Sequence, residues 1–212
     1  MPAPIALRPD PASLPPGQQE RRERIVQAAI SLLERGEYDA IQMRDVAREA
    51  GVALATLYRY FTSKEHLYAA ALLAWAADFP RARPSATNGA TGNGATGNGT
   101  ATGEAQLRAL MRRAVRAFEH YPQMMRVEIV LESPTDPNAR ALFDEFAGHN
   151  RRALMDALSS VDADTAAAIV DTVNSVFVTR LRSWALGRAT IRDVDRSVQR
   201  TLDLIFASAP FT

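Results

Sequence analysis

The sequence predicts an all-α protein. Apolar residues recur at the three- and four-residue spacing of a helix face along most of the chain. No segment shows sustained alternation of apolar and polar residues between turn signals, as a half-buried strand would. Glycines and prolines divide the chain into segments of helical length, so we expect helices joined by loops.

The composition restricts the class of protein. With 212 residues the chain is long enough to bury a core, and the absence of cysteine excludes disulfides and thiolate metal sites. The longest uncharged apolar run, residues 67–77, is too short to span a bilayer. The proline-rich start lacks the apolar region of a secretory signal. We therefore expect a soluble, cytoplasmic protein without a membrane partner.

The chain opens with a proline-rich segment. Six of the 12 prolines lie within the first 16 residues, which predicts a disordered arm over residues 1–19. A first helix is expected from Glu20 to a stop at Gly36, a second over residues 43–50 and a third over residues 54–60.

A fourth helix is predicted by a capping signal. Thr62 and Glu65 have the S/T-x-x-E spacing of a capping box, in which each side chain satisfies a backbone N–H at the start of a helix. The apolar residues that follow continue the helical pattern until Pro80 ends it.

Residues 84–103 separate the two halves of the chain. They contain no charged residue and repeat the sequence Asn-Gly-Ala-Thr-Gly from Asn88 and again from Asn93. Such a composition cannot form a core, so a flexible linker is predicted. Five further helices are expected after it, over residues 107–120, 122–132, 138–158, 163–187 and 191–207.

The pattern over residues 43–60 is that of a helix-turn-helix motif, in which two short helices join through a glycine turn. Its second helix exposes hydroxyl, guanidinium and small apolar groups suited to base edges and phosphates in a DNA major groove. Eight basic and eight acidic side chains occupy residues 20–65, so charge alone does not establish DNA binding.

These residues resemble the TetR-type bacterial transcriptional repressors. The resemblance runs from Arg24 to Leu67 and is most specific over residues 46–52, 56–61 and 63–64. It implies an N-terminal three-helix DNA-binding domain, predicted over residues 20–66. It also implies a helical C-terminal domain for ligand binding and dimerisation, predicted over residues 67–208 and interrupted by the linker.

The residues also resemble a narrower subgroup, the actinobacterial repressors of sterol catabolism. The segments Gln42-Met43-Arg44, Tyr58-Arg59-Tyr60-Phe61 and His66-Leu67 carry this similarity. The chain departs from the commonest family pattern at Gln42 and Ala53, where a hydroxyl residue usually caps a helix. Ala53 leaves one cap unmade, which costs about 1 kcal/mol.

The candidate DNA-binding residues follow from the motif and from the family. The resemblance adds Lys64, the only lysine, as a phosphate contact at the start of the fourth helix. Two alternatives to DNA contact stay open. The first is that the arginines of the first helix form a solvated face with Glu20 and Glu23. The second is that Tyr58 and Tyr60 pack against their own domain as half-buried spacers. The predicted set is Arg21, Arg22, Gln42, Arg44, Leu54, Ala55, Thr56, Tyr58, Arg59, Tyr60 and Lys64.

The C-terminal half contains stripes of methionine and aromatic residues. Such stripes are first of all core, but they also line pockets that adapt to a ligand. The subgroup resemblance implies a large hydrophobic acid as effector, or its fatty-acyl or steroid acyl coenzyme A thioester, with Arg180 as anion partner. The predicted pocket comprises Trp75, Phe79, Met111, Phe118, Met125, Ile129, Phe146, Asn174, Phe177, Arg180 and Trp184.

No cofactor, metal site or catalytic activity is predicted, because the three histidines lack metal-ligand spacing and no nucleophile lies in an activating context. The apolar faces of the last two helices predict a homodimer, which would place two recognition helices on a near-palindromic operator. One of these helices could instead cap its own domain. Three alternatives remain open: a lipid-sequestering helical protein without DNA binding, an activator, and an efflux-type regulator of the same family.

Overall fold

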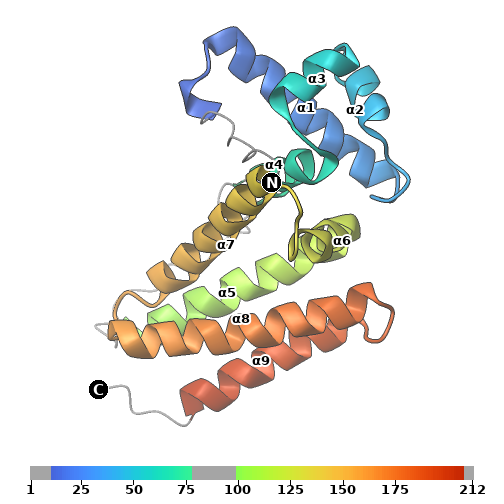
Figure 1. Ribbon diagram of the computed structural model, residues 1–212. Helices are drawn as coiled ribbons and strands as arrows, with labels where there is room; N and C mark the ends of the chain where they lie inside the picture. The colour runs from blue at the N-terminus through green and yellow to red at the C-terminus, as the bar shows by residue number, and fades with distance from the viewer. Residues whose placement is uncertain (1–10, 78–98, 208–212) are drawn as a thin grey trace, which may run out of the picture. The chain divides into compact units, whose positions relative to one another are not determined.

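The computed structural model describes residues 11–77 and 99–207. Within these ranges the chain forms nine α-helices and one short 3-10 helix, Pro11–Ser13, and contains no strand (Figure 1). The all-α prediction is confirmed. Among the described residues, none of the helices combines the length and apolar character needed to span a lipid bilayer.

The helices follow one another in an order close to the predicted one. They are α1 (Pro16–Arg35), α2 (Met43–Glu49), α3 (Leu54–Tyr60), α4 (Lys64–Ala77), α5 (Gly99–His120), α6 (Pro122–Leu131), α7 (Pro137–Ala157), α8 (Ala163–Ala185) and α9 (Ile191–Ala207).

Two helices begin earlier than the sequence predicts. Helix α1 begins at Pro16, inside the predicted arm, because proline fits the first helical position, where no N–H donor is needed. Helix α5 begins at Gly99, inside the predicted linker, and Gly103 is buried against the carbonyl of Ala157. Residues 1–10 of the arm and 84–98 of the linker lie outside the described residues.

The chain divides into two compact units, which are described separately. The first contains α1–α4 together with Tyr121–Ala147, which includes α6 and the first part of α7. The second contains α5, the rest of α7 from Gly148, and α8 and α9. This division differs from the boundary predicted between residues 66 and 67, because α4 packs against both α1 and α6.

Helix α1 supplies much of the core of the first unit. Its buried residues, Ile25, Val26, Ala28, Ala29 and Leu33, recur with the period of the helix and form one face. The rings of Tyr38 and Tyr68 meet edge to face with centroids 5.1 Å apart, and those of Trp75 and Tyr121 do so at 6.0 Å. The three-helix domain therefore shares its core with α4 and α6.

The second unit is built around α9. Figure 1 shows α8 and α9 side by side, and α9 also packs against α5. Val194, Val198 and Leu202 are fully buried, and the ring of Phe177 from α8 lies 6.1 Å from that of Phe118.

The apolar faces of α8 and α9 that the sequence predicts to form the dimer are only partly exposed in this chain. Val173 and Leu181 of α8 and Val194, Val198 and Leu202 of α9 are buried within this one chain, whereas Val176 and Ile205 are half-buried. The buried residues cover the core of their own unit, so they cannot form an interface with a second copy. A dimer through the remaining surface of α8 and α9 stays a prediction.

Candidate nucleic-acid interface

A tight turn joins α2 to α3. Gly51 has a φ of 65°, and the N–H of Val52 donates to the carbonyl of Ala47 at 2.9 Å while that of Gly51 donates to Arg48 at 3.2 Å. These two bonds form a Schellman motif, which ends a helix through one residue in the left-handed region. The predicted glycine turn is therefore present, and it changes the direction of the chain between α2 and α3.

Gly51→Ala is expected to destabilise the protein by about 1–2 kcal/mol, because an L-residue is strained at this φ. Urea unfolding monitored by circular dichroism measures the change. Gly17→Ala is the matched control, since Gly17 has no positive φ and an added methyl group meets nothing within 4 Å. Equal stability of the two variants would contradict the strain argument.

Helix α3 presents most of its side chains outward. Leu57 is fully buried and anchors the helix, whereas Leu54 is 41% and Tyr58 is 44% exposed. Ala55 and Arg59 are also exposed, and Thr56 and Tyr60 are half-buried. The structure therefore gathers the six predicted α3 residues on one short helix, where bulky apolar and aromatic groups face solvent.

The predicted residues on α1 and α2 differ in their surroundings. Arg21, Gln42 and Arg44 are exposed. The guanidinium of Arg22 lies over the ring of Phe61 at 5.2 Å, a cation–π geometry that leaves this arginine half-buried. Gln42 precedes α2, and its N–H donates to the carboxylate of Asp45 at 3.1 Å, which is the reciprocal bond of a capping box.

Lys64 folds back onto the protein. Its ammonium donates to the carbonyl of Tyr38 and lies 4.1 Å from the centroid of that ring. Burial lowers the pKa of Lys64, although the nearby charge of Asp39 acts in the opposite direction. An ammonium has three donors, so the contact with Tyr38 leaves others for a phosphate.

The start of α4 corrects the predicted capping box. Ser63, not Thr62, caps the helix: its hydroxyl accepts from the N–H of His66 at 3.0 Å. Glu65 does not reach back to the cap. Its carboxylate accepts instead from the N–H of Thr135 at 2.9 Å and from that of Asp136 at 3.2 Å, both in the loop between α6 and α7.

Asp136 completes this connection and is only 7% exposed. Its carboxylate accepts from the hydroxyl of Ser63 at 2.6 Å, from that of Thr62 and from the N–H of Asn138 at 2.8 Å. Burial by itself would raise the pKa of Asp136, but the hydrogen bonds outweigh it and lower the pKa to about 2. We call these contacts the junction clamp, comprising Thr62, Ser63, Glu65, Thr135 and Asp136.

The predicted pocket residues fall into both units. Trp75, Met125 and Phe146 are buried and Ile129 is half-buried in the first unit, and Phe79 lies outside the described residues. In the second unit Met111, Phe118 and Phe177 are buried and Trp184 is half-buried. Within this unit the structure does not bring the predicted polar residues to the buried rings, because Asn174 and Arg180 are exposed.

Two family models match the chain. Residues 25–71 match the bacterial regulatory proteins of the tetR family, and residues 99–205 match the tetracyclin repressor-like C-terminal domain. The chain belongs to the tetR family. It is therefore a DNA-binding transcriptional regulator, not an enzyme, as the sequence predicts.

The tetR-family chain is similar to curated repressors over most of its length. It is 29% identical to the HTH-type transcriptional repressor KstR of Rhodococcus jostii, covering 89% of this chain and 84% of that protein. The KstR of Mycobacterium tuberculosis is also 29% identical, with 89% and 81% covered. The predicted resemblance to a KstR-type repressor is confirmed.

Solved structures show the same fold. A TetR transcriptional regulator from Rhodococcus sp. RHA1 is 25% identical, with a TM-score of 0.68 over 89% of this chain and 96% of that one. The Thermus thermophilus repressor FadR, solved with lauroyl-CoA, has a TM-score of 0.61 at 17% identity over 87% and 93% of the two chains.

The sequence did not predict the junction clamp of this tetR-family chain. Thr135 and Asp136 lie about 70 positions from their partners, in a loop whose prolines and polar residues indicate only a turn. A second link was missed as well: Arg126 of α6 pairs with Asp39, before α2, at 3.1 Å. Both contacts tie the DNA-binding helices to α6 and the loop after it.

Proposed function

We propose that this regulator is a repressor that binds a near-palindromic operator as a homodimer and is released by a small hydrophobic effector. One observation carries the proposal: α3 exposes Leu54 and Tyr58 above a fully buried Leu57. A short helix that is anchored on one side and bears apolar and aromatic groups outward is built for a groove of DNA.

The outer face of α8 and α9 is the proposed dimer surface. Leu204 is 64% exposed there. It lines a shallow groove of about 480 Å³ together with Val176, Thr179 and Arg180. A second copy related by a two-fold axis would cover this face, in place of the buried apolar rows.

The proposed effector is a large hydrophobic acid or its fatty-acyl or steroid acyl coenzyme A thioester, and the proposed role is control of lipid or sterol catabolism. The similarity to KstR repressors supports this proposal. Such a regulator acts in the cytoplasm, where its operator is.

The junction clamp supplies the proposed coupling. It holds the start of α4 against the loop between α6 and α7 through carboxylates from both sides. An effector that displaces α6 would therefore move α4 and with it the recognition helices. Release is then a coupling free energy between the effector and operator sites.

The test is a fluorescence polarisation titration with DNA from the regulator's own upstream region and with DNA selected from genomic fragments. Specific binding should weaken steeply with salt, because each phosphate contact releases counterions. Palmitoyl-CoA and a steroid acyl-CoA should each be tested for release, and sedimentation should report a dimer.

Each outcome of this titration has a defined meaning. Specific binding that neither thioester relieves would keep the repressor and reject the effector class. Absence of specific DNA binding, with affinity for a thioester, would favour the lipid-sequestering protein instead.

A further inference from the structure

An arginine-rich groove lies along the seam between α5 and α9. Its volume is about 1050 Å³, at the upper end of the roughly 300–1,000 Å³ typical of small-molecule sites. Five arginines and three carboxylates line it: Arg112, Arg116, Arg192, Arg196, Arg200, Glu119, Asp195 and Asp203. The lining therefore carries an excess of positive charge.

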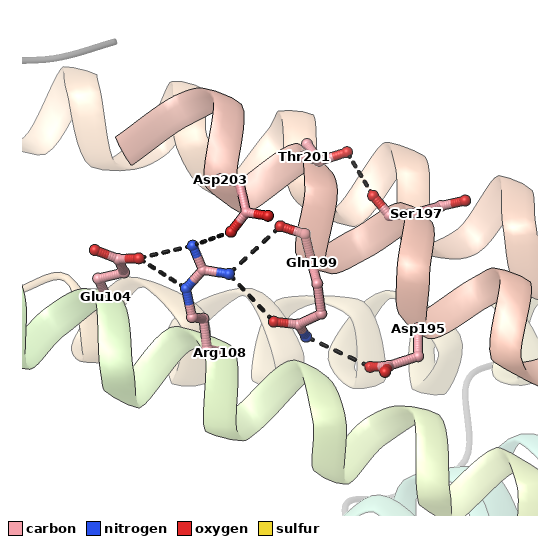
Figure 2. Close-up of polar contacts among 7 residues, drawn as sticks. All are labelled: Glu104, Arg108, Asp195, Ser197, Gln199, Thr201 and Asp203. Atoms are coloured by element: carbon pink, nitrogen blue, oxygen red, sulfur yellow. Dashed lines mark hydrogen bonds and ion pairs between the residues drawn. The ribbon is translucent and has the colours of Figure 1, made fainter. Parts of the chain in front are cut away.

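A polar network joins α5 to α9 beside the lining residues (Figure 2). Arg108 of α5 lies between Glu104 and Asp203, at 2.7 and 2.8 Å from their carboxylates. It also donates to the side chain of Gln199 on α9 at 3.2 Å. Arg108 therefore links the two helices and shares its charge between Glu104 and Asp203, one of the three lining carboxylates.

Most of the lining arginines have no such partner. Arg196 pairs with Asp193 at 2.9 Å. Arg112, Arg116, Arg192 and Arg200 form no ion pair with any described residue. Arg200 also lines the groove of the proposed dimer surface, so Arg112, Arg116 and Arg192 are the guanidinium groups, from two helices, that remain available to a ligand here.

The spacing of these arginines works against stability in the absence of an anion. Arg112 and Arg116 are four residues apart on α5, and Arg192, Arg196 and Arg200 are four apart on α9. Each like-charge pair at this spacing destabilises a helix by a few tenths of a kcal/mol. An anion between the rows would remove this repulsion, and the α9 row spans about 12 Å of helix.

We propose that the α5–α9 groove binds a small molecule that carries a diphosphate group. One guanidinium group can donate two parallel hydrogen bonds to a phosphate, whereas an ammonium group acts as a point charge. Several guanidinium groups in one groove therefore favour a phosphate ligand. Ile191, which is half-buried, gives the lining an apolar side chain that a nucleoside base could contact, whereas Val115 is only 5% exposed. Both a free nucleoside diphosphate and the nucleotide part of coenzyme A carry this chemistry.

The test measures binding of ADP, of coenzyme A and of adenosine to the full chain by isothermal titration calorimetry. The variant is Arg116→Gln with Arg192→Gln, which removes one exposed guanidinium from each helix. The control is Arg152→Gln with Arg188→Gln, two exposed arginines of the same unit that do not line the groove. The groove variant is expected to lose affinity for a diphosphate about tenfold or more, and the control to keep it.

The comparison of ADP with coenzyme A shows which of the two molecules supplies the diphosphate group. Binding of ADP that the groove variant loses supports a nucleotide site, and loss of coenzyme A binding alone assigns the groove to a coenzyme A ligand. Equal binding by the variant and the control, or no binding of either diphosphate by the parent protein, would overturn the proposal. Operator binding of the groove variant is measured in parallel, so that failure here is distinguishable from failure of the repressor function.

Discussion

Tyr58→Ala is expected to weaken binding of the selected operator by about 10- to 100-fold, the cost of one lost base contact. Tyr58 is 44% exposed on α3, next to the exposed Leu54, so its ring can enter a major groove without rearrangement of the core. Because Leu57 holds the helix in place, the free energy of unfolding should stay within about 0.5 kcal/mol of the parent value.

Tyr60→Ala with Lys64→Ala is the contrasting variant. Both side chains are half-buried near the start of α4, where the family pattern places phosphate contacts. Their loss should weaken binding to all DNA sequences alike and reduce the slope of affinity against salt, whereas Tyr58→Ala should change the preference among operators. Polarisation titrations at two salt concentrations with specific and random DNA measure both effects.

Two results would contradict this assignment. Unchanged operator affinity of folded Tyr58→Ala would remove α3 from the interface. A salt slope unchanged by the double variant would mean that the contact of Lys64 with Tyr38 is its whole role.

Local signals predicted the fold well. The glycine turn at Gly51 and the helical periodicity depend on neighbours in sequence, and the structure confirms both. The sequence also indicated which α3 residues face outward, since Leu57 alone continues the apolar pattern within that helix.

Choices between equivalent partners were not predictable. Thr62 and Ser63 both offer a hydroxyl at the start of α4, and only the fold decides that Ser63 caps the helix. Glu65 fits a capping box, but two N–H donors from a distant loop compete for its carboxylate. In the same way, an apolar residue of α9 fits a dimer interface or a core equally well, and the structure shows that Val194, Val198 and Leu202 belong to the core.

Asp136→Asn is expected to cost about 2 kcal/mol of stability at neutral pH. The pKa of Asp136 is about 2 in the folded protein, against an ordinary value of 3.8, so folding favours the ionised carboxylate. A shift of this size corresponds to about 2 kcal/mol. This contribution is fully present above pH 4 and is lost as the pH falls through 2, because the folded-state pKa is the lower of the two.

Urea unfolding of the parent and the variant between pH 2 and 7 measures this loss. The difference between the two proteins should shrink towards low pH. Asp144→Asn is the control, since Asp144 is an exposed carboxylate of α7 and its loss should change stability by at most about 0.5 kcal/mol. A difference between parent and Asp136→Asn that stays constant over the whole pH range would contradict the role of the charged carboxylate.

A double-mutant cycle separates the junction clamp from the helix cap. Ser63→Ala removes two contacts at once, the cap on the N–H of His66 and the hydrogen bond to Asp136. The cap is lost whether or not Asp136 is present, so it cancels in the cycle, and the remaining coupling belongs to the Ser63–Asp136 pair. Because the acceptor is charged and buried, this coupling should be about 1–3 kcal/mol. Additive effects would mean that α4 is held by its own cap, and the loop between α6 and α7 could then not transmit an effector signal through Asp136.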